Sequence, residues 1–152
     1  MKNLNTYIHE KLTIVHKKSY SCAPQTKEDL IDIIKERLKK DQNADLNDID
    51  VSRITDMGVL FAELNLYNID ISQWDVSKVT NMNGMFFNCY NFNSDISSWD
   101  VSNVKDMNGM FWNCKKFNSD LSAWDVSNVK DMKYMFYYCD SMKELPYWHT
   151  KY

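Results

Sequence analysis

Glycine and proline are scarce in this chain, which contains 3 glycines and 2 prolines among 152 residues. No glycine-rich phosphate-binding loop is present, and no histidine belongs to a His-x-x-x-His pattern or accompanies a Gly-x-Ser-x-Gly motif. Catalysis usually needs one asymmetric constellation of reactive side chains, and the sequence offers none. We therefore predict that the protein is not an enzyme and uses no cofactor.

Long apolar runs are absent as well. Residues 1–7 contain no apolar stretch of signal-peptide length, and no later window approaches the roughly 20 apolar residues that span a bilayer. The formal net charge of −3 is small, and no run of like charges suggests a tail that binds nucleic acid or membrane. These absences predict a cytoplasmic protein that does not contact a membrane.

What the chain does contain is a 25-residue unit written almost three times. Trp-Asp-Val-Ser occupies residues 74–77, 99–102 and 124–127, and each occurrence is followed at fixed offsets by Met, Met-Phe and Cys. A weaker copy begins at Ile49, so we expect four copies. A unit this short cannot bury its own apolar face, so the copies are expected to stack and share one continuous core.

Each unit contains a pattern that predicts a helix and another that predicts a strand. Apolar residues at Met107, Met110, Phe111 and Cys114 are spaced i, i+3, i+4, i+7, which places them on one face of a short helix. Residues 120–122 then predict a short strand. The equivalent strands at 95–97 and 70–72 would pair with it in a parallel sheet.

The segment from 92 to 114 reads Phe-Asn-x-Asp-Ile-Ser-x-Trp-Asp-Val-Ser-Asn-Val, followed by Met-x-x-Met-Phe-x-x-Cys. It resembles the BspA-like leucine-rich repeats of bacterial surface antigens and mycoplasmal lipoproteins, over roughly residues 44–145. The resemblance implies a right-handed, curved β/α solenoid that is used for binding and has no shared catalytic residues. We therefore expect an α/β leucine-rich-repeat solenoid of about four 25-residue β/α coils.

Three segments are expected to form a single continuous body. Residues 1–43 are interpreted as an N-terminal cap with one long helix, about 27–40, which opens with a capping box at residues 26–29. The repeats follow over 44–145. Residues 146–152 are interpreted as a C-terminal cap or tail, because Pro146 removes an N–H from the next strand position.

Three of the four cysteines, Cys89, Cys114 and Cys139, recur at one position of the repeat. Stacking would align them with parallel Cβ vectors, which disfavours disulfide pairing. Their spacing on a buried face favours core packing over soft-metal binding. We expect buried free thiols, which suit a reducing compartment.

Aspartates recur in two columns. A calcium site is one interpretation of stacked carboxylates, but the glycine-rich turns that wrap such ions are absent. An Asp side chain that accepts backbone N–H bonds in the following turn explains the columns equally well. We therefore predict no bound metal. The columns consist of Asp50, Asp75, Asp100 and Asp125, and of Asp70, Asp95 and Asp120.

One column keeps aromatic character without keeping identity. Phe87, Trp112 and Tyr137 follow the core Met-Phe pair, and Tyr138 flanks the last of them. Two interpretations stay open: the rings form an outward ridge of the kind favoured at protein interfaces, or they pack sideways and merely cover their layer. A second set of candidate binding residues lies on the sheet side. It consists of Asp95, Ser97, Asp120 and Ser122.

These observations predict a non-catalytic module that binds a protein partner. Lysines near Trp112 could contact nucleic acid, but the acidic columns on the same repeats oppose that reading. Three alternatives stay open: a phage or mobile-element inhibitor that blocks a host defence protein in the host cytoplasm, an adhesion or surface-antigen module, and a structural unit that self-assembles through the aromatic ridge.

Overall fold

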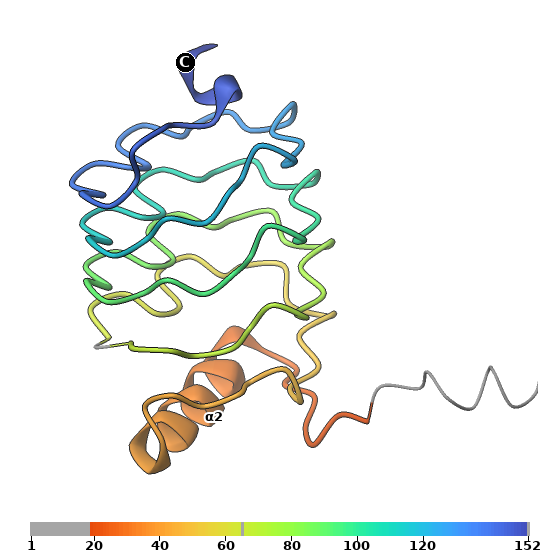
Figure 1. The fold of residues 1–152 in the computed structure, drawn as a ribbon. Helices are drawn as coiled ribbons and strands as arrows, with labels where there is room; N and C mark the ends of the chain where they lie inside the picture. The colour runs from red at the N-terminus through yellow and green to blue at the C-terminus, as the bar shows by residue number, and fades with distance from the viewer. Residues whose placement is uncertain (1–18, 65, 152) are drawn as a thin grey trace, which may run out of the picture.

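Residues 19–64 and 66–151 are described by the computed structural model. They contain the α-helix α2, Lys27–Lys40, and the short 3-10 helix η1, Tyr147–Lys151. Between these two helices the described chain consists of turns, bends and isolated bridges, and it winds in wide loops that follow one another along a single axis (Figure 1). The part of the expected cap over residues 1–18 and the last tail residue lie outside the described residues.

The predicted α/β leucine-rich-repeat solenoid of β/α coils is wrong. Within the described residues no helix occurs in the repeats, and neighbouring copies share isolated parallel bridges instead of a sheet. The bridges join Cys22 to Ile49, Asp45 to Asp70, Asp56 to Asn81, Asn81 to Asp106, and Asp106 to Asp131. The repeat is therefore a layer of turns, and one such layer lies on the next.

Hydrogen bonds from one copy to the next replace the predicted helices. The N–H groups of Met82, Gly84, Phe86 and Asn88 donate to carbonyls 24 residues further along, at distances of 2.8–2.9 Å. An α-helix would need these N–H groups for carbonyls four residues earlier. We call this set of bonds the copy-to-copy ladder. It recurs from residues 57, 59, 61 and 63, and again from residues 107, 109, 111 and 113.

Left-handed backbone also interrupts the predicted helices. Gly84 has a φ of 57° and Asn88 a φ of 60°, and Gly109 and Asn113 adopt the same conformation. Such residues end a right-handed helix, and glycine and asparagine are the residues that adopt this conformation at least cost. The apolar spacing of i, i+3, i+4, i+7 thus arises here from consecutive turns.

The predicted strands at 70–72, 95–97 and 120–122 are turns as well. Asp95 Oδ1 accepts the backbone N–H of Ser97 at 3.0 Å and its hydroxyl at 2.7 Å. Asp70 and Asp120 accept the N–H two residues ahead in the same way. An aspartate that bonds its own following backbone competes with extended structure, which explains the error.

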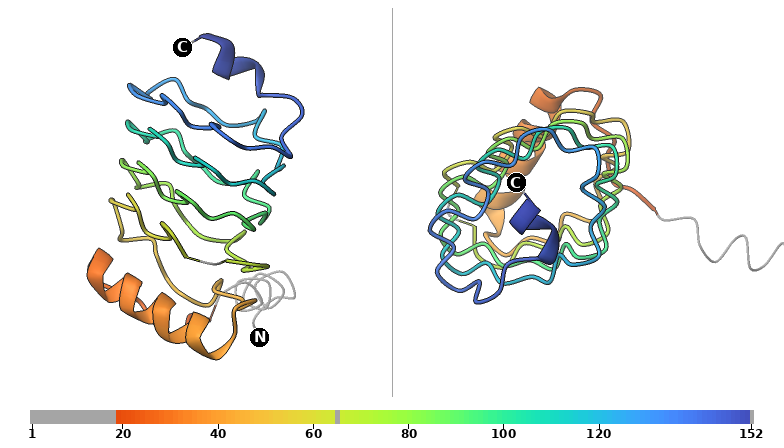
Figure 2. Two further views of the ribbon diagram at one scale, coloured as in Figure 1. Left: turned by 90° about the vertical axis from the view of Figure 1, so that its left-hand side faces the viewer. Right: turned by 90° about the horizontal axis from the view of Figure 1, so that it is seen from above.

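The interior of the stack is filled by repeated side chains. Phe86 and Phe92 stack with ring centroids 3.9 Å apart, and Phe111 and Phe117 do so at 4.1 Å. Phe86 also stacks on Phe111 at 5.6 Å, so the rings form a column through successive copies. These side chains are fully buried together with the repeated Val and Met residues. The loops in Figure 2 therefore enclose a continuous aromatic core.

Helix α2 lies at one end of the stack (Figures 1 and 2). It starts at the predicted capping box, in which the Thr26 side chain accepts from the Asp29 N–H and the Asp29 carboxylate accepts from the Thr26 N–H. Leu30 and Ile34 are buried, and Lys27 pairs with Asp56 at 3.2 Å. The helix is therefore anchored to the first copy by apolar burial and an ion pair.

Trp148 lies at the other end. Its indole N–H donates to the carbonyl of Leu121 at 3.0 Å, as Trp124 donates to Ile96 at 3.2 Å. Pro146 is buried, and the chain then closes into η1. Trp148 thus takes the tryptophan position of a further copy, and η1 follows in place of the turns of the earlier copies.

The left-handed conformation of Gly109 gives a test of this fold. An added Cβ would meet no atom closer than Trp112 Cβ at 3.9 Å, so the cost of Gly109→Ala is conformational and not a clash. We expect the free energy of unfolding in urea to fall by about 1 kcal/mol. In the helix that the sequence predicts, the same change would raise it by about 1 kcal/mol. Asparagine tolerates this conformation, so Gly109→Asn should lower the free energy of unfolding by less than Gly109→Ala does.

Candidate interaction surface

The three aromatic residues predicted from one column lie in contact. The ring centroids of Phe87 and Trp112 are 5.9 Å apart, and those of Trp112 and Tyr137 are 4.6 Å apart. Phe87 and Trp112 are half-buried, whereas Tyr137 is 45% exposed. The rings pack on one another along the stack axis, and the exposed end of the row lies on the last copy.

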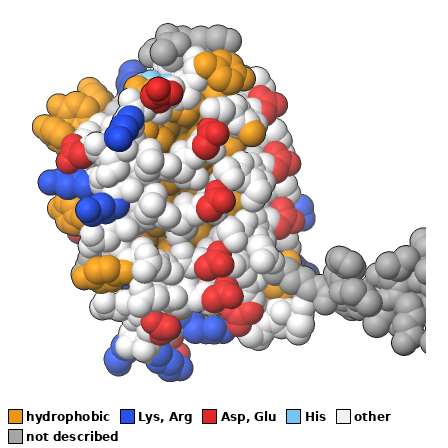
Figure 3. Space-filling model, in the orientation of Figure 1, with side chains coloured by type: hydrophobic (Ala, Val, Ile, Leu, Met, Phe, Trp, Pro, Cys, Tyr) orange, Lys and Arg blue, Asp and Glu red, His pale blue; other side chains and the backbone are white. Residues whose placement is uncertain are grey.

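Two further tyrosines surround this row. The ring centroid of Tyr138, a predicted site residue, lies 4.2 Å from that of Tyr137. The ring centroid of Tyr134, which was not predicted, lies 5.4 Å from that of Trp112. Their exposed fractions are 57% and 59%. We call Phe87, Trp112, Tyr134, Tyr137 and Tyr138 the aromatic patch. In Figure 3 hydrophobic side chains protrude from one side of the stack towards its C-terminal end, beside lysines or arginines.

Backbone strain accompanies the exposed end of the patch. Tyr134 has a φ of 58° and Tyr138 a φ of 60°, in the left-handed region. Earlier copies carry Gly109 and Asn113 at the equivalent positions. A bulky residue costs roughly 1–2 kcal/mol in this conformation. In the sequence, the signal for this residue is tyrosine at position 134, where the two preceding copies carry Gly84 and Gly109.

The tyrosine hydroxyls of the patch interact. A hydrogen bond with Tyr138 raises the pKa of Tyr137, so the Tyr137 phenol is protonated at neutral pH. It can therefore act as both hydrogen-bond donor and acceptor. The patch combines apolar ring faces with a polar rim.

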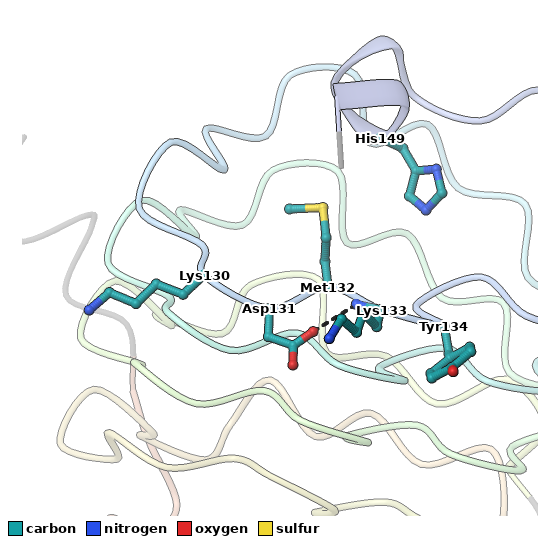
Figure 4. Close-up of a pocket in the computed structure, with 6 residues that line it drawn as sticks. All are labelled: Lys130, Asp131, Met132, Lys133, Tyr134 and His149. Atoms are coloured by element: carbon teal, nitrogen blue, oxygen red, sulfur yellow. Dashed lines mark hydrogen bonds between the residues drawn. The ribbon is translucent and has the colours of Figure 1, made fainter.

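A hollow of about 450 Å³ adjoins Tyr134. Figure 4 shows residues 130–134 on one side and His149 of η1 on the other. Asp131 accepts the backbone N–H of Lys133 at 3.0 Å, and burial lowers the pKa of His149. At neutral pH the positive side-chain charges lining the hollow are therefore those of Lys130 and Lys133. Lys130, Asp131, Met132, Lys133, Tyr134 and His149 line it.

The other predicted binding residues hold turns together. Asp95 bonds Ser97, and Asp120 accepts the N–H of Ser122 at 2.9 Å. Hydrogen bonds from these serine side chains lower the pKa of both carboxyls. Asp95, Ser97 and Asp120 border a hollow of about 300 Å³, but no hydrogen bond or ring contact between described residues links this group to the aromatic patch. Their role in binding stays a prediction.

The repeated cysteines are free and buried. The Cys114 thiol donates to the Phe86 carbonyl at 3.0 Å, and Cys89 and Cys139 make equivalent bonds. Burial raises the pKa of Cys89 and Cys139 to about 12 and raises that of Cys114 as well. Thiolate is the form that attacks or binds metal, so these sulfurs are structural. In the described part of the chain no group of three His, Cys, Asp or Glu residues is placed to hold a metal.

The fold and the patch define a repeat protein that is built from stacked turns and presents exposed aromatic rings. The chain belongs to the family described as "Mycoplasma protein of unknown function, DUF285", whose model matches residues 30–148. This family is related to BspA-like repeat proteins, and the match does not establish leucine-rich repeats. No curated protein and no solved structure gives a significant match. Over residues 19–64 and 66–151, no helix is long and apolar enough to cross a membrane.

The buried thiols give a chemical test of the stack. At pH 9 a thiol-specific chromogenic disulfide reagent should modify the half-buried Cys22 in the native protein, while Cys89, Cys114 and Cys139 stay unmodified because burial disfavours their thiolates. In denaturant all four should react. The Cys22→Ser variant should show almost no native reaction, and rapid modification of its remaining thiols would contradict the buried column.

Proposed function

We propose that the protein is a non-catalytic module that binds a protein partner through the aromatic patch. The observation that carries this proposal is the contact cluster of Trp112, Tyr134, Tyr137 and Tyr138, in which all three tyrosines are exposed. Trp and Tyr dominate the energetics of protein interfaces because each buries a large rigid surface and keeps a polar group at its tip.

The rings of the cluster contact one another in the free chain. Trp112 lies 4.6 Å from Tyr137 and 6.3 Å from Tyr138, so each ring restricts its neighbours. Fixing a free side chain on binding costs roughly 0.5–1.5 kcal/mol, and rings that are held in advance avoid part of this cost. The patch is thus better suited to binding than isolated surface tyrosines.

The strained backbone supports the same proposal. The second and third copies carry glycine and asparagine at the positions of Tyr134 and Tyr138, and the first copy carries Val59 and Glu63 in the same left-handed conformation. Tyrosine at these positions is strained and gains little burial in the free protein. A partner that covers the rings would supply the missing burial. The relation to BspA-like repeats, a type used for binding, also favours recognition over catalysis.

The single experiment that tests the proposal is capture with matched variants. The tagged chain, its Trp112→Ala/Tyr137→Ala double variant and a Tyr90→Ala control are used to enrich partners from the native host, followed by mass spectrometry. Tyr90 is 47% exposed and lies outside the patch. We expect one partner to be retained by the wild type and by the control and to be reduced at least about tenfold for the double variant, since interface aromatics often contribute 2 kcal/mol or more.

Folding and self-association are controlled in the same experiment. The urea midpoint of the double variant should show that it is folded at the capture temperature. Equal enrichment by all three chains would contradict the role of the patch. Enrichment of the chain alone, with light scattering that shows oligomers lost in the double variant, would favour the self-assembling unit instead. Whether the partner belongs to a host defence system or a cell surface stays a prediction.

A further inference from the structure

The copy-to-copy ladder has a direction. In every layer the N–H groups at alternate positions point towards the C-terminal end, and the carbonyls that accept them point back. Met107, Gly109, Phe111 and Asn113 donate in this way to Asp131, Lys133, Met135 and Tyr137 at 2.7–2.9 Å. Each layer donates to the next, but over residues 19–64 and 66–151 no carbonyl accepts from the layer that begins at Met132.

Those donors are the N–H groups of Met132, Tyr134, Phe136 and Tyr138, which we call the open donor row. Among the described residues, none of them donates to a carbonyl or to a side chain. The N–H groups of the residues between them bond inside the layer. The Met135 N–H, for example, donates to the Met132 carbonyl at 3.2 Å. A row of unpaired backbone donors at an edge is a template on which another chain can pair.

One acceptor carbonyl beside the row receives no backbone N–H from the described residues. The carbonyls of Thr80 and Lys105 each accept an N–H from the following layer, from Lys105 and Lys130 at 2.8 Å. The Lys130 carbonyl has no such donor among residues 19–64 and 66–151. The complement of this edge is therefore an extended chain that offers several carbonyls in register and one N–H. This geometry is that of strand addition.

The described C-terminal segment does not pair the row. The rings of Trp148 and His149 contact the ring of Phe136, with centroids 6.2 Å and 5.3 Å away, but no described carbonyl of this segment accepts an N–H of the row. The hollow between residues 130–134 and His149 lies along the row (Figure 4). Helix α2 covers the opposite end of the stack, which disfavours head-to-tail pairing with a second copy.

Charge selects the kind of chain that fits. Lys130 and Lys133 are exposed at the beginning of the row, and the row itself presents the positive ends of N–H dipoles. The Asp131 carboxylate accepts hydrogen bonds from the Lys133 backbone N–H at 3.0 Å and from the Asn108 side-chain amide at 3.4 Å. Asp140 lies past the far end of the row. Acidic side chains of a bound chain would therefore face the two lysines.

We propose that an acidic, extended segment of the protein partner adds to the open donor row as a further layer. Its carbonyls accept from Met132, Tyr134, Phe136 and Tyr138, and its carboxylates face Lys130 and Lys133. Its apolar side chains contact Tyr134 and Tyr138. This inference rests on the proposed function, because these two tyrosines belong to both the row and the aromatic patch.

The test follows the backbone amides directly. The full ¹⁵N-labelled chain is titrated by NMR with the end-capped peptide Glu-Val-Glu-Val-Glu-Val, and with Lys-Val-Lys-Val-Lys-Val as the control. With the acidic peptide we expect downfield shifts and slower hydrogen exchange at the four amides of the row, and little change with the basic peptide. Unchanged row amides at millimolar acidic peptide, or equal shifts with both peptides, would overturn the inference.

A charge exchange gives a second readout. The Lys130→Glu/Lys133→Glu variant alters only exposed side chains and should fold normally. Its affinity for the acidic peptide should fall at least about tenfold, and the basic peptide should now bind. Unaltered preference for the acidic peptide would count against the row. Protection of the row amides in the free chain that rises with its concentration would show a second copy as the occupant and would also overturn the inference.

The two proposals can fail separately. If capture of the partner depends on Trp112 and Tyr137 but acidic peptide leaves the row amides unchanged, the proposed function stands and strand addition is wrong. If the peptide shifts the row amides while partner capture is insensitive to the aromatic variants, the role of the patch is wrong and the open donor row is the binding site.

Discussion

Backbone hydrogen bonds between copies organise this protein. The N–H groups at alternate positions of a layer donate to carbonyls of the next layer. Phe86, for example, donates to the Met110 carbonyl and Phe111 to the Met135 carbonyl. The bonds of the copy-to-copy ladder are short and regular and point towards the C-terminal end, whereas Lys105 and Lys130 donate back to the preceding copy. The two ends of the stack are consequently unlike. One end is covered by α2, and the other carries donors that the described chain does not pair.

The repeated side chains serve this stacking. Phenylalanine rings fill the axis, and each tryptophan indole bonds a carbonyl of the copy before it, as Trp99 bonds Ile71 at 3.1 Å. Aspartates close turns, and cysteine thiols bond buried carbonyls. Tyr134 and Tyr138 do none of these things. They are exposed and adopt left-handed backbone, which is why recognition is proposed for their surface.

Sequence reasoning succeeded where the cause is local. Helix α2 follows from a capping box and an apolar face within one stretch of chain. It failed in the repeats because helical spacing also suits consecutive turns, and Gly84 and Asn88 at left-handed positions were the overlooked sign. At the candidate site, the 25-residue period predicted the column of Phe87, Trp112 and Tyr137. It did not predict Tyr134, because Tyr134 stands at another position of the repeat and meets Trp112 only in the folded chain.

The amino-acid sequence by itself determined the period, the residues that are buried and the position of α2, because composition and local hydrogen bonding decide these features. The tertiary structure alone decided where the repeat N–H groups go, since the competing partners lie either within one turn or 24 residues away. That choice turned predicted helices into layers of turns. It also left the open donor row beside the aromatic patch, because no carbonyl among the described residues accepts from those four N–H groups.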